Sequence, residues 1–306
     1  MAKRVSRRIK ITKHKFIIIM RNHLIAIQGS VASFHDLAAK KYFGEEVTIV
    51  ECPSFQSVCE KIKNSKADYG IIAIENKVAG SILLNYQLIE EYDLKIIGET
   101  YLPIELQLFA NKGAKLDEIK EIVSHPMALG QSQNFLAGLE NVIVSEYKDT
   151  STCAKLVGED KSNKLGVIAG SAVGKKYGLH SLVENVGDVK ENFTRFYIIS
   201  KGADYVANSD KASVTITLND KPGCLLKVLE VLNKYSLNLT KIQSVPIPED
   251  MRNYSFHLDI EFDQREKLDK VLTEIKPLTN SLKVLGIYKG DTARLKTLND
   301  ITKNLN

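Results

Sequence analysis

A continuous apolar run at residues 69–74 (Tyr-Gly-Ile-Ile-Ala-Ile) constrains the fold more than any other feature of the chain. A strand with one face in water alternates polar and apolar residues, whereas a strand covered on both faces is apolar throughout. The run therefore predicts a buried strand in a sheet with helices on both sides. Other short apolar runs alternate with helix-like segments between residues 24 and 200, so we expect an α/β domain with parallel sheets.

The pattern changes after a polar segment at 202–211, which we interpret as a linker. Residues 213–218 alternate as a strand, and a helix with regularly spaced leucines follows from residue 223. Two strands at 239–245 and 254–262, a second helix around 268–275 and a last strand at 283–288 complete the series. The order βαββαβ is typical of the ferredoxin-like fold.

The charge of the chain is concentrated at its start. Residues 1–19 hold seven of the 42 basic residues and none of the 37 acidic ones, so the rest is close to neutral and we expect no nucleic-acid binding. We expect residues 1–22 to be a basic, disordered leader, and we favour Met20 as the true start, with a targeting signal as the alternative. No apolar run is long enough to span a membrane, and the four cysteines form no CxxC pair. We therefore expect a cytoplasmic protein with no membrane association and no metal site.

Hydroxyl, amide and imidazole side chains stand where predicted strands end and helices begin. They occur at four junctions: Ser33; Asn76 with Ser81; Ser124 with His125; and Ser151 with Thr152. Helix N-termini favour negative charge, and open α/β sheets bind ligands beyond the carboxyl ends of their strands. The pattern indicates a site for a small anion, which we infer to be a carboxylate.

The segment Asn192-Phe193-Thr194-Arg195-Phe196 combines an amide, a hydroxyl, a guanidinium and two rings. In a β-strand, Asn192, Thr194 and Phe196 share one face, while Phe193 and Arg195 share the other. A polar pair beside a ring could hold a small acid at a cleft. The alternative is a strand entry with a solvated arginine.

Six stretches, in order, resemble prephenate dehydratase followed by an ACT regulatory domain, and the resemblance covers residues 22–290. The stretches are Ser33-Phe34-His35, with Ala32 replacing the family's glycine; Ile74-Glu75-Asn76 with Gly80-Ser81; Ser124-His125-Pro126 with Gln131; Ser151-Thr152; Ile168-Ala169 through Leu179; and Asn192 with Thr194-Arg195-Phe196.

The resemblance implies a two-lobed catalytic domain, like periplasmic binding proteins, plus a ferredoxin-like βαββαβ ACT domain. The catalytic domain would span 23–201, with one lobe at 23–98 plus 194–201 and the other at 99–190. The ACT domain would span 212–290, after the linker and before a tail at 291–306. Since only about 22 residues precede the first strand, we expect no fused chorismate mutase.

The family's reaction converts prephenate into phenylpyruvate, carbon dioxide and water in L-phenylalanine biosynthesis. It is the reaction of a carbon–oxygen lyase, and it needs no cofactor because aromatisation of the ring drives it. The resemblance implies Thr194 as the hydrogen-bond donor to the leaving hydroxyl, with Asn76 and Gln131 as further neutral donors. The residues that it implies for substrate binding are Ser33, Ser81, Ser124, His125, Ser151, Thr152, Asn192, Arg195 and Phe196. Strand alternation turns Arg195 away from Thr194, so a structural ion pair is its alternative role.

The ACT domain implies feedback inhibition by L-phenylalanine at a site between subunits, and hence a homodimer or homotetramer. The implied effector residues are Pro222, Gly223, Cys224, Leu225, Leu226, Asn238, Gln243 and Ser244. Gln243 and Val245 depart from the family's Glu-Ser-Arg-Pro segment, and a domain kept only for dimerisation is the alternative. For the whole chain, the alternatives are an arogenate dehydratase or a non-catalytic amino-acid sensor on a binding-protein fold.

Overall fold

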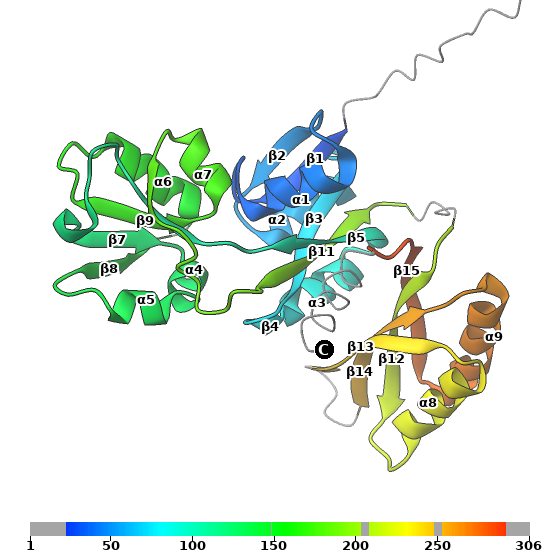
Figure 1. The fold of residues 1–306 in the computed structure, drawn as a ribbon. Helices are drawn as coiled ribbons and strands as arrows, with labels where there is room; N and C mark the ends of the chain where they lie inside the picture. The colour runs from blue at the N-terminus through cyan, green and yellow to red at the C-terminus, as the bar shows by residue number, and fades with distance from the viewer. Residues whose placement is uncertain (1–22, 148, 203–207, 248–252, 292–306) are drawn as a thin grey trace, which may run out of the picture.

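The computed structural model describes residues 23–147, 149–202, 208–247 and 253–291. These residues form three sheets with their helices, and the first sheet lies between the other two (Figure 1). The expected leader at 1–22, residues 203–207 of the expected linker and the tail from residue 292 lie outside the described residues.

The first sheet is mixed rather than parallel. Its strands lie in the order β2 (Thr48–Cys52), β1 (Leu24–Gln28), β3 (Tyr69–Asn76), β11 (Phe193–Ser200) and β5 (Lys95–Pro103), and the short β4 (Gly80–Ser81) pairs with β3. β1 is parallel to β2 and β3, whereas β11 is antiparallel to β3 and β5. The expectation of a parallel sheet is wrong because β11 returns from the second lobe and enters between β3 and β5 in the opposite direction.

Helices cover both faces of the first sheet, as the apolar run at 69–74 predicts. They are α1 (Phe34–Phe43), α2 (Phe55–Lys63) and α3 (Leu83–Glu91). Ile71 packs in the core that includes Ala38 of α1. Ile72 and Ile74 pack on the opposite face, in the core that includes residues of α2 and α3. The prediction of a strand buried on both faces is confirmed.

The second sheet forms a separate lobe. Its strands lie in the order β10 (His180–Val183), β6 (Gln107–Ala110), β9 (Leu165–Ala169), β7 (Glu121–Ser124) and β8 (Ile143–Glu146). Its helices are η1 (Leu116–Glu118), α4 (Pro126–Gly130), α5 (Gln133–Ala137), α6 (Thr150–Glu159) and α7 (Ser171–Lys176). Because β5 of the first sheet continues to Pro103, the expected lobe boundary between residues 98 and 99 falls inside a strand, and the crossing lies after Pro103.

The third sheet is antiparallel, and its strands lie in the order β13 (Asn238–Pro246), β14 (Asn253–Glu261), β12 (Lys211–Asn219) and β15 (Ser281–Tyr288). The helices are α8 (Cys224–Lys234), α9 (Arg265–Ile275) and the short η2 (Lys276–Leu278). The chain order βαββαβ confirms the predicted ferredoxin-like arrangement. β12 begins at Lys211, so this residue belongs to the sheet and not to the linker.

The face of the third sheet that α8 and α9 leave open packs against the first sheet. Leu285 and Tyr288 of β15 belong to the same buried core as Ile96 of β5 and Tyr197 of β11. The two parts therefore share a core and are not joined by the linker alone. None of the helices in the described part of the chain is both long and apolar enough to cross a membrane.

Candidate functional site

Asn76 and Thr194 lie opposite each other on paired strands of the first sheet. Asn76 is the last residue of β3, and Thr194 of β11 is its cross-strand partner. The Asn76 Nδ2 donates to Thr194 Oγ1 at 3.0 Å and to Asn192 Oδ1 at 2.9 Å, and all three side chains are buried. Because the Thr194 oxygen accepts this hydrogen bond, the Thr194 hydroxyl hydrogen can be donated to a bound ligand.

Gln131 joins these residues from the second lobe, where it is the C-cap of α4. Its Nε2 donates to Asn76 Oδ1 at 3.3 Å, and its Oε1 accepts from Asn192 Nδ2 at 3.1 Å. Asn76 Oδ1 also accepts from the backbone N–H groups of Val78 and Ala79, which fixes the orientation of the amide in a turn. Four residues therefore meet where the two lobes adjoin, and three of them are the expected catalytic residues. We call these four residues the amide cluster: Asn76, Gln131, Asn192 and Thr194.

A pocket of about 380 Å³ lies between the two lobes. The first lobe contributes residues that follow β1 and β2, including Gly29 and Ser30, and the second lobe contributes Ser151, Thr152 and Lys155 at the start of α6. A helix N-terminus and a lysine both attract negative charge. Glu51 and Asp149 also line the pocket, where each accepts a hydrogen bond from a backbone N–H group, so the part of it that favours an anion is the start of α6 with Lys155.

The two predicted hydroxyl groups in this pocket differ in what they contact. Thr152 Oγ1 donates to Asp149 Oδ2 at 2.9 Å, and Asp149 also accepts from the Thr152 backbone N–H as the N-cap of α6. The Ser151 Oγ is buried and has no hydrogen-bond partner among the described residues. Since a buried hydroxyl without a partner is costly, Ser151 is the stronger candidate to bind a ligand.

Arg195 does not face the cleft. It lies on the face of β11 opposite Thr194, where its Nε donates to Glu99 Oε2 at 2.7 Å and its Nη1 to Asp259 Oδ2 at 2.5 Å. Lys211 completes the group by donating to Glu99 Oε1 at 2.8 Å. The structure contradicts the assignment of Arg195 to substrate binding and supports the alternative, a structural ion pair, here between the first and third sheets.

The charges of this ion pair stabilise each other inside the protein. Burial alone would lower the pKa of Arg195, but its partners, Asp259 first and Glu99 among the others, together outweigh burial and hold that pKa well above its ordinary value. Burial alone would raise the pKa of Asp259, but the Arg195 guanidinium holds it below its ordinary value. Burial raises the pKa of Tyr197, whose hydroxyl donates to Asp259 Oδ1 at 3.0 Å. Arg195 and Asp259 are therefore both ionised and paired with each other.

Phe196 and Ser124 are also buried in their lobes. Phe196 is 1% exposed and packs in the core beside α1, with its ring centroid 5.2 Å from that of His35. Ser124 is 0% exposed, and its Oγ donates to the Ile168 carbonyl oxygen at 2.5 Å, which ties β7 to β9. Both side chains are therefore engaged within the lobes, and their roles toward a substrate stay predictions.

Three further predicted side chains are engaged by the protein itself. Ser33 is the N-cap of α1, as expected, and its Oγ accepts from the Asp36 N–H. His125, not Ser124, is the N-cap of α4, because its Nδ1 accepts from the Met127 N–H at 3.2 Å, and burial lowers the pKa of His125. Ser81 Oγ accepts from Lys241 Nζ at 2.8 Å. Their roles toward a substrate stay predictions.

Charged partners on neighbouring strands were not predicted from the sequence, among them Glu99, Asp259 and Lys241. Each is a charged residue in a predicted or observed strand whose neighbours are largely apolar. A charge in such a position is rarely buried unless it is paired, so the pattern itself indicates buried ion pairs. It does not indicate which residues pair, because the partners are far apart in the sequence.

The expected effector residues lie at two ends of the third sheet. At one end, the chain enters α8 through Gly223, whose φ of +81° suits a glycine. The residues at this entry are Pro222, Gly223, Cys224, Leu225 and Leu226. Ser244 of β13 lies near the same end, because it and Ile216 of β12 both pair with Phe256. Gln243 precedes it, and its Nε2 donates to the Ser244 carbonyl oxygen.

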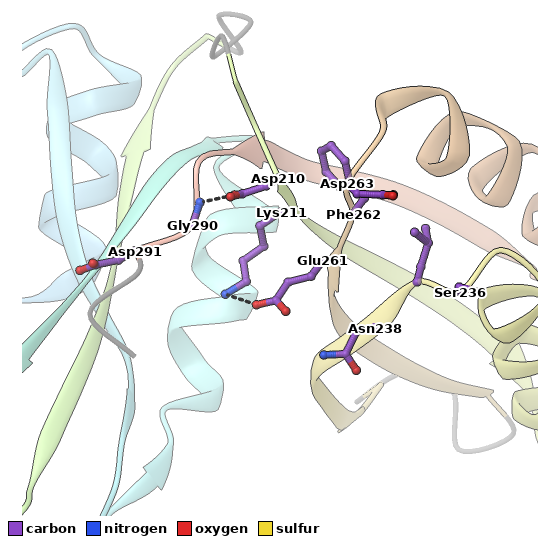
Figure 2. A pocket seen from close by; sticks show the side chains of 10 residues that line it. Asp210, Lys211, Ser236, Asn238, Glu261, Phe262, Asp263, Gly290 and Asp291 are labelled. Atoms are coloured by element: carbon purple, nitrogen blue, oxygen red, sulfur yellow. Dashed lines mark hydrogen bonds and ion pairs between the residues drawn. The ribbon is translucent and has the colours of Figure 1, made fainter. Parts of the chain in front are cut away.

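Asn238 lies at the opposite end of the sheet, in a pocket of about 470 Å³. Figure 2 shows this pocket, in which Asn238 and Glu261 extend from neighbouring strands and Lys211 points toward Glu261. None of the residues that line it belongs to the amide cluster. A single chain therefore does not bring Asn238 together with the residues at the entry to α8.

Comparison with known proteins gives a consistent family. The family model for prephenate dehydratase matches residues 25–204. A bifunctional chorismate mutase/prephenate dehydratase of Aquifex aeolicus is 34% identical over 266 residues, covering 86% of this chain and 73% of the relative. A prephenate dehydratase of Methanocaldococcus jannaschii is 33% identical over 263 residues, covering 84% and 94%. Arogenate dehydratase 2 of Petunia hybrida is 30% identical over 286 residues, covering 88% and 72%.

Two solved structures are similar over most of the chain. One is the prephenate dehydratase of Arthrobacter aurescens in complex with L-Phe, with a TM-score of 0.77, 25% identity, and coverage of 87% of this chain and 90% of that chain. The other is described as a novel type of quorum-quenching acylase, with a TM-score of 0.80, 26% identity, and coverage of 89% and 100%. Both matches extend beyond the family model and therefore into the third sheet.

Proposed function

The chain belongs to the prephenate dehydratase family, and on this premise we propose that it converts prephenate into phenylpyruvate, carbon dioxide and water in L-phenylalanine biosynthesis. The observation that carries the proposal is the amide cluster, in which Asn76 of β3 donates to the Thr194 hydroxyl while Gln131 of the second lobe and Asn192, just before β11, bond to Asn76 and to each other. Residues expected to act on the substrate come from both lobes and meet at one point.

The amide cluster suits this chemistry because all its members are neutral. Prephenate carries two carboxylates, and a charged acid in the cluster would repel it. Loss of the ring carboxylate as carbon dioxide leaves its bonding electrons in the ring, and the opposite hydroxyl departs as water after gaining one proton. Thr194 is the donor to that hydroxyl, with the proton supplied from solvent through it. Asn76 bonds directly to Thr194, and Gln131 holds the Asn76 amide in place. A positioned donor of this kind contributes roughly 10²–10⁴-fold.

The pocket between the lobes would hold the carboxylates. Ser151, Thr152 and Lys155 lie there at the N-terminus of α6, and the Ser151 hydroxyl is unpaired among the described residues. A carboxylate placed at the start of α6 would be attracted by Lys155 and by the helix dipole, and it would have to lie away from Glu51 and Asp149, which line the same pocket. The same groups would accept arogenate, which has an amine in place of the side-chain keto group of prephenate.

We assign residues 212–290 to an ACT regulatory domain that binds L-phenylalanine between subunits of a cytoplasmic homodimer or homotetramer. The ferredoxin-like order of the third sheet and the L-Phe complex of a similar prephenate dehydratase support this assignment. Because the entry to α8 and Asn238 lie at opposite ends of the sheet, a site between two copies would take one group from each. An allosteric coupling of about 1–3 kcal/mol would be typical.

The test is turnover of prephenate by the purified protein, with arogenate in parallel and with and without L-phenylalanine. The matched variants are Thr194→Ala, which removes the hydroxyl, and Thr194→Ser, which keeps it. We expect the alanine variant to lose about 10²-fold or more in kcat and the serine variant to keep most of it. L-Phenylalanine should lower the activity of the unmodified protein.

Each alternative has its own outcome. Turnover of arogenate but not prephenate would make the protein an arogenate dehydratase. Binding of an amino acid without turnover of either compound would favour a non-catalytic sensor. Turnover that L-phenylalanine does not affect would show that the third sheet does not regulate the enzyme and would favour a domain kept for dimerisation. Equal activity of Thr194→Ala and the unmodified protein would remove Thr194 from the mechanism.

A further inference from the structure

Four charged residues of alternating sign meet where the third sheet packs against the first. Glu75 and Arg195 are cross-strand partners in β3 and β11, and Asp259 and Lys241 are cross-strand partners in β14 and β13. Lys241 Nζ lies 3.1 Å from Glu75 Oε2, and Arg195 Nη1 lies 2.5 Å from Asp259 Oδ2. Arg195 Nη1 and Glu75 Oε2 are 3.9 Å apart. Each charged residue of the first sheet therefore lies beside a residue of opposite charge in the third sheet.

The two members of this group in the first sheet adjoin the amide cluster. Glu75 directly precedes Asn76, and Arg195 directly follows Thr194. Side chains alternate along a strand, so Glu75 and Arg195 face the third sheet while Asn76 and Thr194 face the other way. A displacement of either charged residue would therefore move a residue of the amide cluster through one peptide unit.

Lys241 contacts the segment that carries Asn76 at two points. Besides Glu75, its Nζ donates to Ser81 Oγ at 2.8 Å. Glu75 and Ser81 are themselves cross-strand partners in the β3–β4 hairpin, whose turn is closed by the Asn76 side chain. Lys241 is 9% exposed, and its Nζ lies 5.6 Å from the centroid of the Tyr86 ring. The lysine thus holds both strands of the hairpin from outside the catalytic lobes.

We propose that Lys241, which the third sheet supplies, is a positioning residue of the active site: it holds the β3–β4 hairpin so that the Asn76 amide stays directed at Thr194. The inference rests on the proposed function for what the Asn76 amide does. Lys241 is on the opposite side of the hairpin from the amide cluster and acts only through Glu75 and Ser81. The third sheet is then a part of the catalytic apparatus, and removing it would leave Asn76 without its support.

The matched experiment compares two lysines of the third sheet that contact the first lobe. Lys241→Met removes the contacts to Glu75 and Ser81. The control, Lys283→Met, removes contacts of Lys283 Nζ to the Glu90 carbonyl oxygen and to Asp93, which lie at α3 and the turn after it. Lys241→Arg keeps the charge, and Glu75→Gln weakens the same contact from the other side. Each variant is assayed for kcat and KM and for amide hydrogen exchange of residues 77–81.

For Lys241→Met we expect kcat to fall on the order of 10- to 100-fold, because a small misplacement of a catalytic group has an effect of that size. KM should change little, since Lys241 does not touch the substrate. The amides of Val78 and Ala79, which donate to Asn76 Oδ1, should exchange faster. Lys241→Arg should recover most of the activity, and Lys283→Met should match the unmodified protein in both measurements.

An unchanged kcat and unchanged exchange in Lys241→Met would overturn the inference, as would equal losses in Lys283→Met. If Lys241→Met does not fold, Glu75→Gln decides. Faster exchange at residues 78–79 together with a lower kcat supports the inference, whereas the absence of both changes overturns it. If the unmodified protein turns over neither prephenate nor arogenate, the proposed function fails. The exchange measurement then decides alone whether Lys241 holds the hairpin.

Discussion

His35 illustrates how a single side chain makes stability depend on pH. Its ring lies between those of Phe55 and Phe196, with centroid distances of 5.4 and 5.2 Å. Its buried Nε2 has no hydrogen-bond partner among the described residues. Burial lowers the pKa of His35 from 6.5 to about 4, because the surroundings offer nothing to stabilise the charged ring.

The folded state therefore binds the His35 proton less readily than the unfolded state does. The stability that this histidine contributes is fully present above pH 6.5 and is lost as the pH falls from 6.5 toward 4. Between pH 7 and pH 5 the loss should be about 2 kcal/mol. His257, whose pKa burial also lowers to about 4, adds a similar loss.

The variant His35→Phe should lack the part of this pH-dependent loss of stability that His35 causes, because phenylalanine takes no proton. Urea unfolding of this variant and of the unmodified protein at pH 7 and pH 5 measures the difference, with His35→Phe losing about 2 kcal/mol less. An identical pH dependence in the two proteins would show that His35 takes up its proton equally well in the folded state.

At the scale of elements, strand β15 lies so close to β5 that one of its residues has no room for a side chain. A Cβ on Gly286 would lie 2.0 Å from the Ile96 carbonyl oxygen and 2.8 Å from the Ile96 carbonyl carbon. Both atoms belong to the backbone of the first sheet, so the contact cannot be relieved by a change of rotamer. The third and first sheets approach each other through this glycine.

Gly286→Ala should therefore separate β15 from β5 and lower the free energy of unfolding by about 1–3 kcal/mol, as overpacking of a core does. Gly202→Ala is the control, because a Cβ there meets nothing within 4 Å. Thermal and urea unfolding of the two variants give the comparison. If both variants were equally stable, the contact between β15 and β5 would have to be softer than the distances indicate.

The elements show which parts of the fold could be predicted from the sequence. The apolar run at 69–74 and the N-cap Ser33 carry local signals, and the structure has a buried strand and a capped helix at these positions. Both Ser124 and His125 stand before α4, and the sequence does not show which of them caps it: serine is the commoner capping residue, but Ser124 is buried and His125 is the cap. The direction of β11 depends on the side from which the chain re-enters the first sheet, and no local sequence pattern indicates that side.

The residues of the amide cluster were predicted from a resemblance, whereas the charged residues that pack behind them, on the other face of the sheet, were not predicted. Glu99 and Asp259 bind Arg195 across 96 and 64 residues of sequence. Strand alternation alone shows that Arg195 faces away from Thr194, but it does not show that a second domain covers that face. Contacts of this range follow from how the sheets pack, so they appear only in the structure.

At the scale of the whole molecule, the interface between the first and third sheets contains buried charged residues, each of which needs its partner of opposite charge to offset the cost of burial. Arg195 is 3% exposed, and Glu99 and Asp259 are each 2% exposed. Removing Arg195 leaves Asp259 without its guanidinium partner in a place where water cannot replace it. Breaking a buried pair in this way costs about 3–5 kcal/mol.

We therefore expect Arg195→Met to lower the free energy of unfolding by about 3–5 kcal/mol in urea titrations. Lys267→Met, which breaks the solvent-exposed pair of Lys267 with Asp263, should have little effect. Because Arg195 faces the third sheet and not the cleft, KM for the substrate should be nearly unchanged under conditions where Arg195→Met is still folded. A large rise in KM without a loss of stability would instead place the guanidinium on the substrate, and it would require the ion pair with Asp259 to open during catalysis.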